Sequence, residues 1–225
     1  MRLSSLYECF IAPILFPQQN VCPVCHRFLS GTACLCSVCE SQLKKQRLAD
    51  EKALFRVPPV RNCLSVYAYK GAARQMVHLL KYRSAVSLSQ PLGEAMCLRL
   101  IHQRALYKRI DLVIPVPLHP SRQEERGYNQ AELLAKVLCE TCRMPLRTEL
   151  LVRVKKTGSQ VGRSRSERIH ALRGAFEAED PSALYNRCIL LVDDVLTTGA
   201  TALSCGDALY RAGAKEVALI TACRA

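Results

Sequence analysis

The fold of this 225-residue chain is decided by the stretch Cys188-Ile189-Leu190-Leu191-Val192-Asp193-Asp194-Val195-Leu196-Thr197-Thr198-Gly199-Ala200-Thr201. Its first five residues are apolar and predict a strand that is buried on both faces. Two acids follow, then a turn rich in threonine and glycine, and then a helical pattern over Ala202–Ala212 that Gly213 ends. Strand, turn and helix in this order predict an α/β unit with polar side chains at the carboxyl edge of its sheet, where such proteins bind ligands.

The residues at this edge are suited to a phosphorylated ligand. Gly199 allows close approach of the backbone, and the threonine hydroxyls and the free N–H groups at the start of the helix can donate to an anion. Asp193 and Asp194 suit the hydroxyls of a sugar, or a hydrated Mg²⁺ that accompanies a pyrophosphate. A plain helix cap is the alternative, but a cap requires neither both acids nor the sequence Thr-Thr-Gly-x-Thr.

The same alternation of strand and helix extends over residues 56–225. Three further apolar segments predict strands, and three amphipathic segments predict helices. The strands are expected at Cys63–Tyr69, Leu112–Val116 and Val217–Thr221, and the helices at Ala72–Tyr82, Leu92–His102 and Ala131–Cys142. This alternation predicts an α/β fold with a parallel sheet flanked by helices on both faces.

Two Cys-x-x-Cys pairs precede this domain, Cys22 with Cys25 and Cys36 with Cys39. Zinc takes four thiolates in a tetrahedron, and each tight turn presents two sulfurs to one ion. We therefore expect residues 1–55 to form a small zinc module and a linker helix. A structural Zn²⁺ would supply the folding energy that so small a segment lacks.

Two alternatives to this ligand set stay open. Cys34 can replace Cys36, although its spacing from Cys39 suits a zinc knuckle poorly. His26 adjoins Cys25 and is expected beside the ligands or in solvent. A redox pair is the alternative to a metal site, and two spaced pairs favour zinc.

The other cysteines lack the pattern of a secreted disulfide framework. The count of 13 is odd, and Cys97, Cys188 and Cys223 lie in apolar runs, where a free thiol behaves as a small hydrophobe. Cys139 and Cys142 lie on a predicted helix without a matching second pair, so we assign them a structural role. This cysteine usage predicts a reducing compartment.

The beginning of the chain contains the apolar run Phe10–Phe16. A run of this length is too short to span a bilayer. No small-residue cleavage site follows it, as a signal peptide would require. We therefore expect no membrane span and a cytoplasmic protein.

These motifs together resemble one known family. Ile189–Thr201 is similar to the 13-residue phosphoribosyl pyrophosphate (PRPP) signature of type I phosphoribosyltransferases. Asp111–Arg122, Arg126–Gln130 and Tyr67–Gly71, together with the double Cys-x-x-Cys, resemble the competence protein F-like phosphoribosyltransferases over essentially the whole chain. The resemblance implies a type I phosphoribosyltransferase fold preceded by a small four-Cys zinc module.

The resemblance also implies roles for single residues. Asp193 and Asp194 would hold the ribose 2- and 3-hydroxyls of PRPP, which arrives with Mg²⁺, and they are the catalytic candidates. The 5-phosphate would lie against the turn, which comprises Val195, Leu196, Thr197, Thr198, Gly199, Ala200 and Thr201. The pyrophosphate loop would be Pro117–Arg122, with Pro117, Leu118 and Arg122 as contacts. Arg122 and Arg126 would supply positive charge to it, and surface arginines are the alternative reading for both.

A basic segment over residues 153–173 contains seven Lys and Arg residues and one acid, Glu167. Its Gly- and Ser-containing first half favours a flexible loop. The resemblance implies a loop that closes over the site and excludes water, although Ala171 stands where the family commonly has asparagine. A clamp for single-stranded nucleic acid and a solvated loop are the alternatives; the candidate residues of such a clamp are Lys155, Lys156, Arg163, Arg165 and Arg168.

The overall charge favours anionic partners. The chain has 32 Lys and Arg against 19 Asp and Glu, a formal net charge of +13. The resemblance implies a PRPP-binding protein of natural competence that handles single-stranded DNA after uptake. Competence or DNA-processing proteins would then dock on the zinc module. The alternative is a phosphoribosyltransferase of nucleotide salvage that transfers ribose 5-phosphate to a nitrogen acceptor, and the sequence identifies no such acceptor.

Overall fold

The computed structural model describes residues 21–29, 33–49, 54–57, 60–83, 85–155, 167 and 171–225. The expectations for the apolar run at the beginning of the chain and for most of the basic segment lie outside the described residues. Within the described residues, no helix has both the length and the apolar character needed to cross a membrane.

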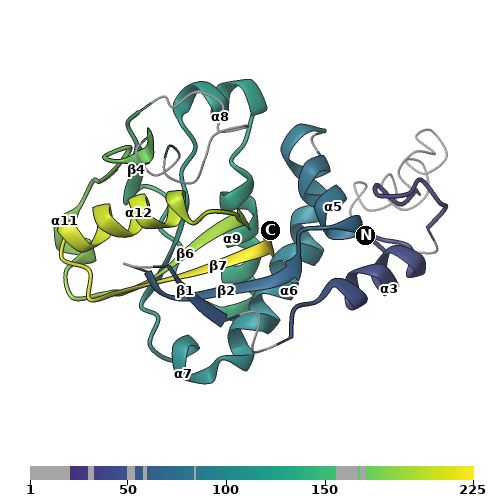
Figure 1. Ribbon diagram of the computed structural model, residues 1–225, viewed down its shortest axis with the longest axis horizontal. Coiled ribbons are helices and arrows are strands. Elements are labelled where there is room, and N and C mark those ends of the chain that lie inside the picture. Colours follow the sequence, from purple (N-terminus) through teal and green to yellow (C-terminus); the bar gives the residue numbers. More distant parts are fainter. Residues whose placement is uncertain are drawn as a thin grey trace, which may run out of the picture.

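A five-stranded sheet forms the centre of the molecule (Figure 1). Its order is β1-β2-β7-β6-β3, and the last four strands run parallel, whereas β1 is an antiparallel edge strand. The strands are β1 (Leu54–Val57), β2 (Val60–Ala68), β3 (Leu112–Pro115), β6 (Cys188–Leu196) and β7 (Glu216–Arg224). The expected parallel sheet is thus confirmed.

Helices cover both faces of this sheet, as expected. Alternate residues of β6 belong to two hydrophobic clusters, because successive side chains of a strand point to opposite faces. Leu190 and Val192 pack with the helices α5 (Gly71–Tyr82), α6 (Ser89–His102) and α9 (Gln130–Cys142). Ile189 and Leu191 pack with α12 (Ala200–Arg211) and with a small second sheet of β4 (Leu151–Arg153) and β5 (Phe176–Ala178).

Shorter helices connect these elements. They are α3 (Ser37–Gln46), the 3₁₀ turn η3 (Val86–Leu88), α7 (Arg104–Tyr107), α8 (Pro120–Arg126) and α11 (Pro181–Leu184). Two of them, α8 and α11, begin with proline, which suits the first turn of a helix because its missing N–H would have no partner there. Of these helices, α8 lies at the carboxyl edge of the sheet and contributes to the candidate site.

Strand β6 extends further than the sequence predicts. The expected strand ended at Val192, whereas β6 continues to Leu196 because β7 pairs with it along this whole length, up to Leu196 opposite Arg224. Strand β3 stops earlier, at Pro115 opposite Val192. Asp193 and Asp194 therefore lie inside a strand, in the part of β6 that extends beyond its neighbour β3.

Helices α6 and α9 approach each other closely at Gly93. A Cβ atom at this position would lie 2.6 Å from the Cβ of Val137, so only glycine fits without movement of α9.

One turn further on, Cys97 forms a disulfide with Cys142 of α9. The interpretation of Cys97 as a free thiol was therefore wrong. The two cysteines are 45 residues apart, and only the packing of the two helices brings them together.

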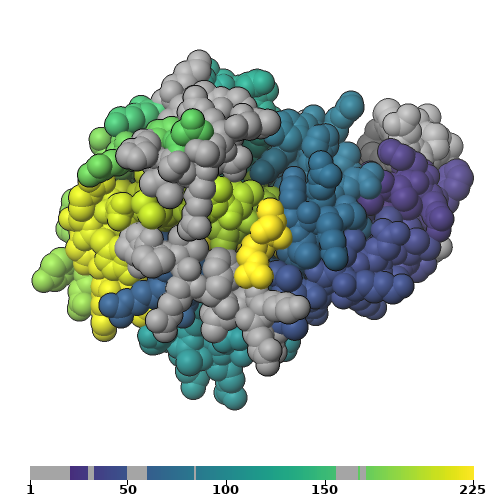
Figure 2. Space-filling view, in the orientation of Figure 1, coloured from purple at the N-terminus to yellow at the C-terminus, as the bar shows by residue number. Residues whose placement is uncertain are grey.

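The N-terminal module shares the core of the main domain. Its buried residues Cys22, Val24, Leu35, Cys39 and Leu43 belong to the hydrophobic cluster that α5, α6 and α9 build on the sheet. Figure 2 shows the module, in purple, as a lobe that adjoins the blue surface of α5. The division at residues 55 and 56 stays a prediction, and it falls within β1.

A side chain of this module caps the first turn of helix α5. The side chain of Gln46, the last residue of α3, accepts a hydrogen bond of 2.9 Å from the backbone N–H of Ala73. This N–H is one of the unpaired donors of the first turn of α5, and no side chain of the residue before the helix caps it. Gly71 has a φ of +47°, and a Cβ there would lie 2.2 Å from the Gln46 amide nitrogen. Glycine at this position is therefore required both by the backbone and by the cap.

We expect Gly71→Ala to lower the free energy of unfolding by about 2–3 kcal/mol, because it strains the backbone and displaces Gln46. Gln46→Ala, which removes only the cap, should cost about 1 kcal/mol. Urea denaturation of both variants and of the double variant measures these values. The double variant should lose less free energy of unfolding than the two single variants lose together, because both changes remove the same cap. Strictly additive losses would contradict this account.

Candidate functional site

The two acids of the signature point to opposite faces of β6. Asp193 lines a cavity of about 80 Å³ together with the turn that follows the strand. Asp194 is buried on the other face, where its Oδ1 lies 2.8 Å from the Nζ of Lys81 at the end of α5. The two carboxylates thus do not form a side-by-side pair, and only one of them faces the turn.

The turn after β6 has the form of an anion cradle. Gly199 adopts a φ of 80°, a left-handed conformation that glycine tolerates best, and α12 starts at the next residue. The hydroxyl of Thr198 accepts a hydrogen bond of 3.4 Å from the backbone N–H of Ala200. The cavity is lined by Leu172, Asp193, Val195, Leu196, Thr197, Thr198, Gly199, Ala200, Thr201, Ala202 and Leu219. All seven turn residues predicted from the sequence are therefore brought together around one cavity at a helix N-terminus.

Charges converge on Asp193. Burial and the neighbouring Asp194 carboxylate raise the pKa of Asp193 to about 7, although Lys81 and Arg153 oppose this shift. Arg153, on β4, has a lowered pKa because it is largely buried and because the positive charge of Arg122 lies nearby. The charge of Arg153 thus acts on Asp193, and the charge of Arg122 acts on Arg153.

One carboxylate oxygen of the two acids remains available to a further ligand. Burial opposes the positive charge of Lys81, but the Asp194 carboxylate outweighs it and raises the pKa of Lys81. The second oxygen of Asp194, Oδ2, is buried without a hydrogen-bond partner among the described residues. A buried acceptor of this kind favours an additional donor or a cation. The carboxylate oxygens can accept hydrogen bonds from sugar hydroxyls or ligate Mg²⁺, the two roles that the sequence predicts for them with PRPP.

The segment expected as a pyrophosphate loop is only partly a loop. Residues 116–119 are extended, and the backbone N–H of Val116 still donates to Val192 O at 2.9 Å. Helix α8 then begins at Pro120, capped by the ring of His119, so Arg122 lies in the first turn of a helix. The loop predicted at Pro117–Arg122 is therefore shorter than expected, because its second half belongs to α8. Pro117 and Leu118 are half-buried at the end of β3, in the position expected for the loop backbone.

The residues that follow α8 tie its end to the sheet and to α5. The buried side chain of Asn129 caps α9 by accepting from Ala131 N, and it donates to Val116 O at 3.0 Å. The hydroxyl of Tyr128 donates to Leu80 O. Arg126 donates to the side chain of Gln130. The motif Arg126–Gln130 thus fixes three elements to one another, which explains its residue types structurally.

Most of the basic segment lies outside the described residues. This applies to Lys156, Arg163, Arg165 and Arg168. Of the predicted nucleic-acid contacts, Lys155 is described, and its Nζ donates to the backbone oxygen of Arg173 at 3.1 Å. Ala171 immediately precedes Leu172, whose side chain lines the cradle and whose backbone oxygen accepts from Ser204. The end of the basic segment therefore lies at the cavity beside the turn after β6.

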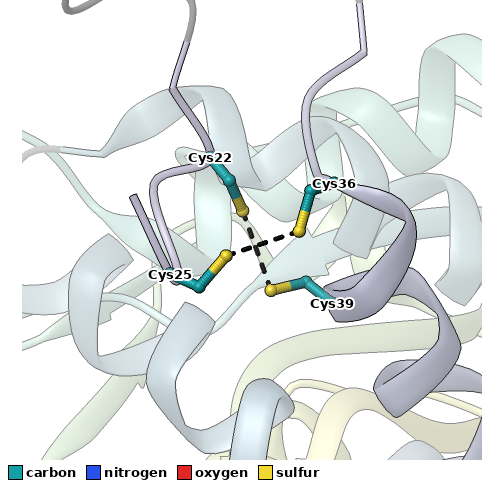
Figure 3. A group of neighbouring side chains, drawn as sticks. All are labelled: Cys22, Cys25, Cys36 and Cys39. Carbon is teal, nitrogen blue, oxygen red and sulfur yellow. Dashed lines mark hydrogen bonds between the residues drawn. The ribbon is translucent and has the colours of Figure 1, made fainter. Parts of the chain in front are cut away.

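The four predicted cysteines of the N-terminal module form one cluster, in which the sulfur atoms point toward a common centre (Figure 3). All four sulfur atoms lie within 4.8 Å of one another, with 3.7 Å between Cys22 and Cys39 and 3.4 Å between Cys25 and Cys36. Zn–S bonds of about 2.3 Å in a tetrahedron separate the sulfurs by roughly 3.8 Å, so the cluster fits a metal ion such as zinc.

The structure decides between the alternatives for this cluster. Cys36 belongs to it, whereas Cys34 is exposed and takes no part. His26 is exposed and is not among the clustered ligands. A hydrogen bond from the backbone of Cys39 lowers the pKa of Cys36 to about 7, and burial raises the pKa of Cys39. A lowered thiol pKa favours the thiolate that a metal requires.

Two residues of the site were missed from the sequence. Lys81 lies on a predicted amphipathic helix, and nothing in its local pattern shows that the helix ends beside Asp194. Arg153 was placed in the basic segment and not at the site. The sequence offered one indirect signal: two acids near a buried strand end, beside an anion-binding turn, require positive charge nearby. The pattern did not identify which of 32 basic residues supply it.

We expect the purified protein to contain about one zinc ion per chain, and Cys39→Ser to lose most of it, because three thiolates bind zinc far more weakly than four. Atomic absorption after dialysis measures the content. Cys34→Ser is the matched control and should retain the metal, since this exposed cysteine lies outside the cluster. Equal zinc in both variants would contradict the ligand assignment.

A pH dependence follows from Asp193. Its pKa in the folded protein is raised above its ordinary value of 3.8, so the folded state binds this proton more tightly than the unfolded state does. Stability should therefore fall as the pH rises from about 4 to 7, and Asp193→Asn should be more stable than the wild type at pH 8 by about 1–2 kcal/mol. Urea denaturation at pH 4 and pH 8 tests this; a less stable variant at pH 8 would overturn it.

Comparison with known proteins gives whole-length relatives. No family model matches the chain. It is 28% identical over 214 residues to the DNA utilization protein YhgH of Escherichia coli K12, which covers 94% of this chain and 93% of that protein. It is 27% identical to competence protein F of Haemophilus influenzae, over 89% of this chain and 88% of that protein. Competence protein ComFC of Bacillus subtilis is 29% identical, over 81% of this chain and 68% of that protein.

Solved structures give weaker and partial similarity. A glutamine PRPP amidotransferase from B. subtilis matches with a TM-score of 0.38 at 20% identity, over 60% of this chain and 26% of that chain. A purine phosphoribosyltransferase from Pyrococcus horikoshii matches with a TM-score of 0.35 at 15% identity, over 58% of this chain and 68% of that chain. The stronger similarity is therefore to the sequence relatives, the DNA utilization protein YhgH, competence protein F and ComFC.

Proposed function

We propose that this protein binds PRPP with Mg²⁺ and acts in natural competence and transformation, where it handles single-stranded DNA in the cytoplasm after uptake. The observation that carries the proposal is the phosphate cradle beside Asp193, found in a chain whose relatives are named for competence and DNA utilization. The net charge of +13 supports a polyanionic partner.

The geometry supports a division of labour at the PRPP site. The turn Thr197–Thr201 and the start of α12 would hold the 5-phosphate. Asp193 lines the cradle and would hold one ribose hydroxyl there. Asp194 faces α5, and its unsatisfied oxygen would accept from the second hydroxyl of a sugar that lies across the end of β6. Arg122 and Arg153 would face the pyrophosphate, and Mg²⁺ would neutralise part of its charge.

The metal module supports a structural and docking role in this function. Its four cysteines fit Zn²⁺, and its buried residues continue the core of the main domain. Outside this cluster, six cysteines of the described part of the chain are free and two form the Cys97–Cys142 disulfide, so most of them suit a reducing cytoplasm. Competence or DNA-processing proteins would dock on the exposed side of this module.

One titration tests both halves of the proposal. A labelled single-stranded oligonucleotide is titrated with protein at 50 mM and about 200 mM salt, with and without Mg–PRPP, and followed by fluorescence anisotropy. We expect binding that weakens steeply with salt, because phosphate contacts release counterions. Mg–PRPP should change the affinity by about five-fold or more. The double variant Asp193→Asn and Asp194→Asn should bind DNA without responding to PRPP.

Asp207→Asn is the matched control for the acid variants, since Asp207 is an exposed acid on α12. It should behave like the wild type in every arm of the titration. Absence of DNA binding, or binding indifferent to PRPP in the wild type, would contradict the proposal. In that case release of pyrophosphate with nucleobases as acceptors would be measured to test the salvage enzyme.

A further inference from the structure

A second cavity is lined in part by Lys81, the residue that pairs with Asp194. Its volume is about 310 Å³, and it is formed by the end of α5 together with α8 and the residues after it. Figure 1 shows α5 and α8 on the same, upper side of the sheet. The cavity is lined by Lys81, Tyr82, Arg122, Glu125, Arg126 and Tyr128. A pocket of this size is at the lower end of those that hold small ligands.

The aromatic side chains of this cavity are presented to solvent in an unusual way. Tyr82 is 64% exposed, although it lies in a concave part of the surface. The guanidinium carbon of Arg126 lies 5.4 Å from the centre of the Tyr82 ring, and the centre of the His78 ring, one helix turn earlier, lies 5.0 Å from it. These neighbours hold the ring in place but leave most of it uncovered. Tyrosine and arginine planes held in this way are the surfaces on which unpaired bases stack.

The charge of the cavity is positive. Three of the six lining side chains are cationic, and one, Glu125, is acidic. Arg122 is half-buried and also lies close enough to Arg153 to lower the pKa of that residue. The cavity therefore offers charge for a phosphate beside a flat aromatic surface, which is the chemistry of one nucleotide unit.

Position links this cavity to the acids of β6. Lys81 lines the cavity, and its Nζ lies 2.8 Å from Asp194. The hydroxyl of Tyr128 donates to Leu80 O, so the wall of the cavity is fixed to the same turn of α5 that carries Lys81. A ligand that changes the pairing of Asp194 also changes the charge presented to this cavity.

We propose that this cavity binds a nucleotide unit of single-stranded DNA, with its base stacked on Tyr82 and its phosphate held by Arg126. The inference rests on the proposed function and assigns it a place: the strand passes over the ends of α5 and α8, beside the PRPP site. The exposed aromatic ring distinguishes this site from a plain phosphate site, because a phosphate gains nothing from stacking.

The test measures anisotropy of two labelled oligonucleotides of equal length, oligo(dT) and a strand in which most positions are abasic. Tyr82→Ala should weaken binding of oligo(dT) about ten-fold and leave binding of the abasic strand unchanged. Tyr82→Phe retains the ring and should stay within about two-fold of the wild type. Tyr185→Ala is the matched control, since Tyr185 is 73% exposed, near the amino end of β6, away from the cavity. Its affinity should equal that of the wild type.

The outcomes separate this inference from the proposed function. If the wild type binds oligo(dT) and Tyr82→Ala binds it equally well, the cavity assignment is wrong while DNA binding stands. If the wild type binds neither strand, the proposed function fails. Competition with dTMP and with pyrophosphate identifies the source of the nucleotide chemistry. If dTMP or pyrophosphate displaced the strand at a concentration equal to that of the strand itself, the cavity would be a site for a free nucleotide or diphosphate. This result would overturn the inference.

Discussion

Successive side chains of a β-strand point to opposite faces of the sheet, and this constraint organises the candidate site. Two adjacent acids at the end of β6 cannot both face the phosphate cradle, so Asp193 lies beside the turn and Asp194 faces α5. The early end of β3 leaves this part of β6 without a neighbour on one side. Each acid thus faces a different side of the sheet: Asp193 lines the cradle, and Asp194 pairs with Lys81.

The ion pair of Lys81 with Asp194 stabilises the buried carboxylate on the face of β6 that packs against α5. A buried carboxylate without a partner costs several kcal/mol, and a single lysine at the end of α5 offsets much of this cost. The pairing is incomplete, because the second oxygen of Asp194 has no hydrogen-bond partner among the described residues. On the other face, the raised pKa of Asp193 records the same conflict between burial and charge. The site therefore holds poorly satisfied carboxylates, whose suitable partners are hydroxyl donors or a cation.

The sequence was sufficient for the features that depend on local pattern. Apolar strands alternating with amphipathic helices predicted the parallel sheet, and the spacing of the cysteines predicted the ligand cluster. It was insufficient where distant segments meet. The disulfide of Cys97 with Cys142 requires the close packing of α6 on α9, and the role of Lys81 depends on where α5 ends relative to β6. The continuation of β6 past Val192 depends on its pairing with β7, which no local pattern reveals.

Helix α5 joins the metal module to the candidate site. Its first turn is capped by Gln46 of the module, and Gln75 donates to Val24 O at 2.6 Å within the module. Its last turn carries Lys81 and Tyr82. A helix of 12 residues is about 18 Å long and transmits a shift of one end to the other because its backbone hydrogen bonds keep it rigid. Helix α5 therefore connects the four-Cys module directly to the residue that pairs with Asp194.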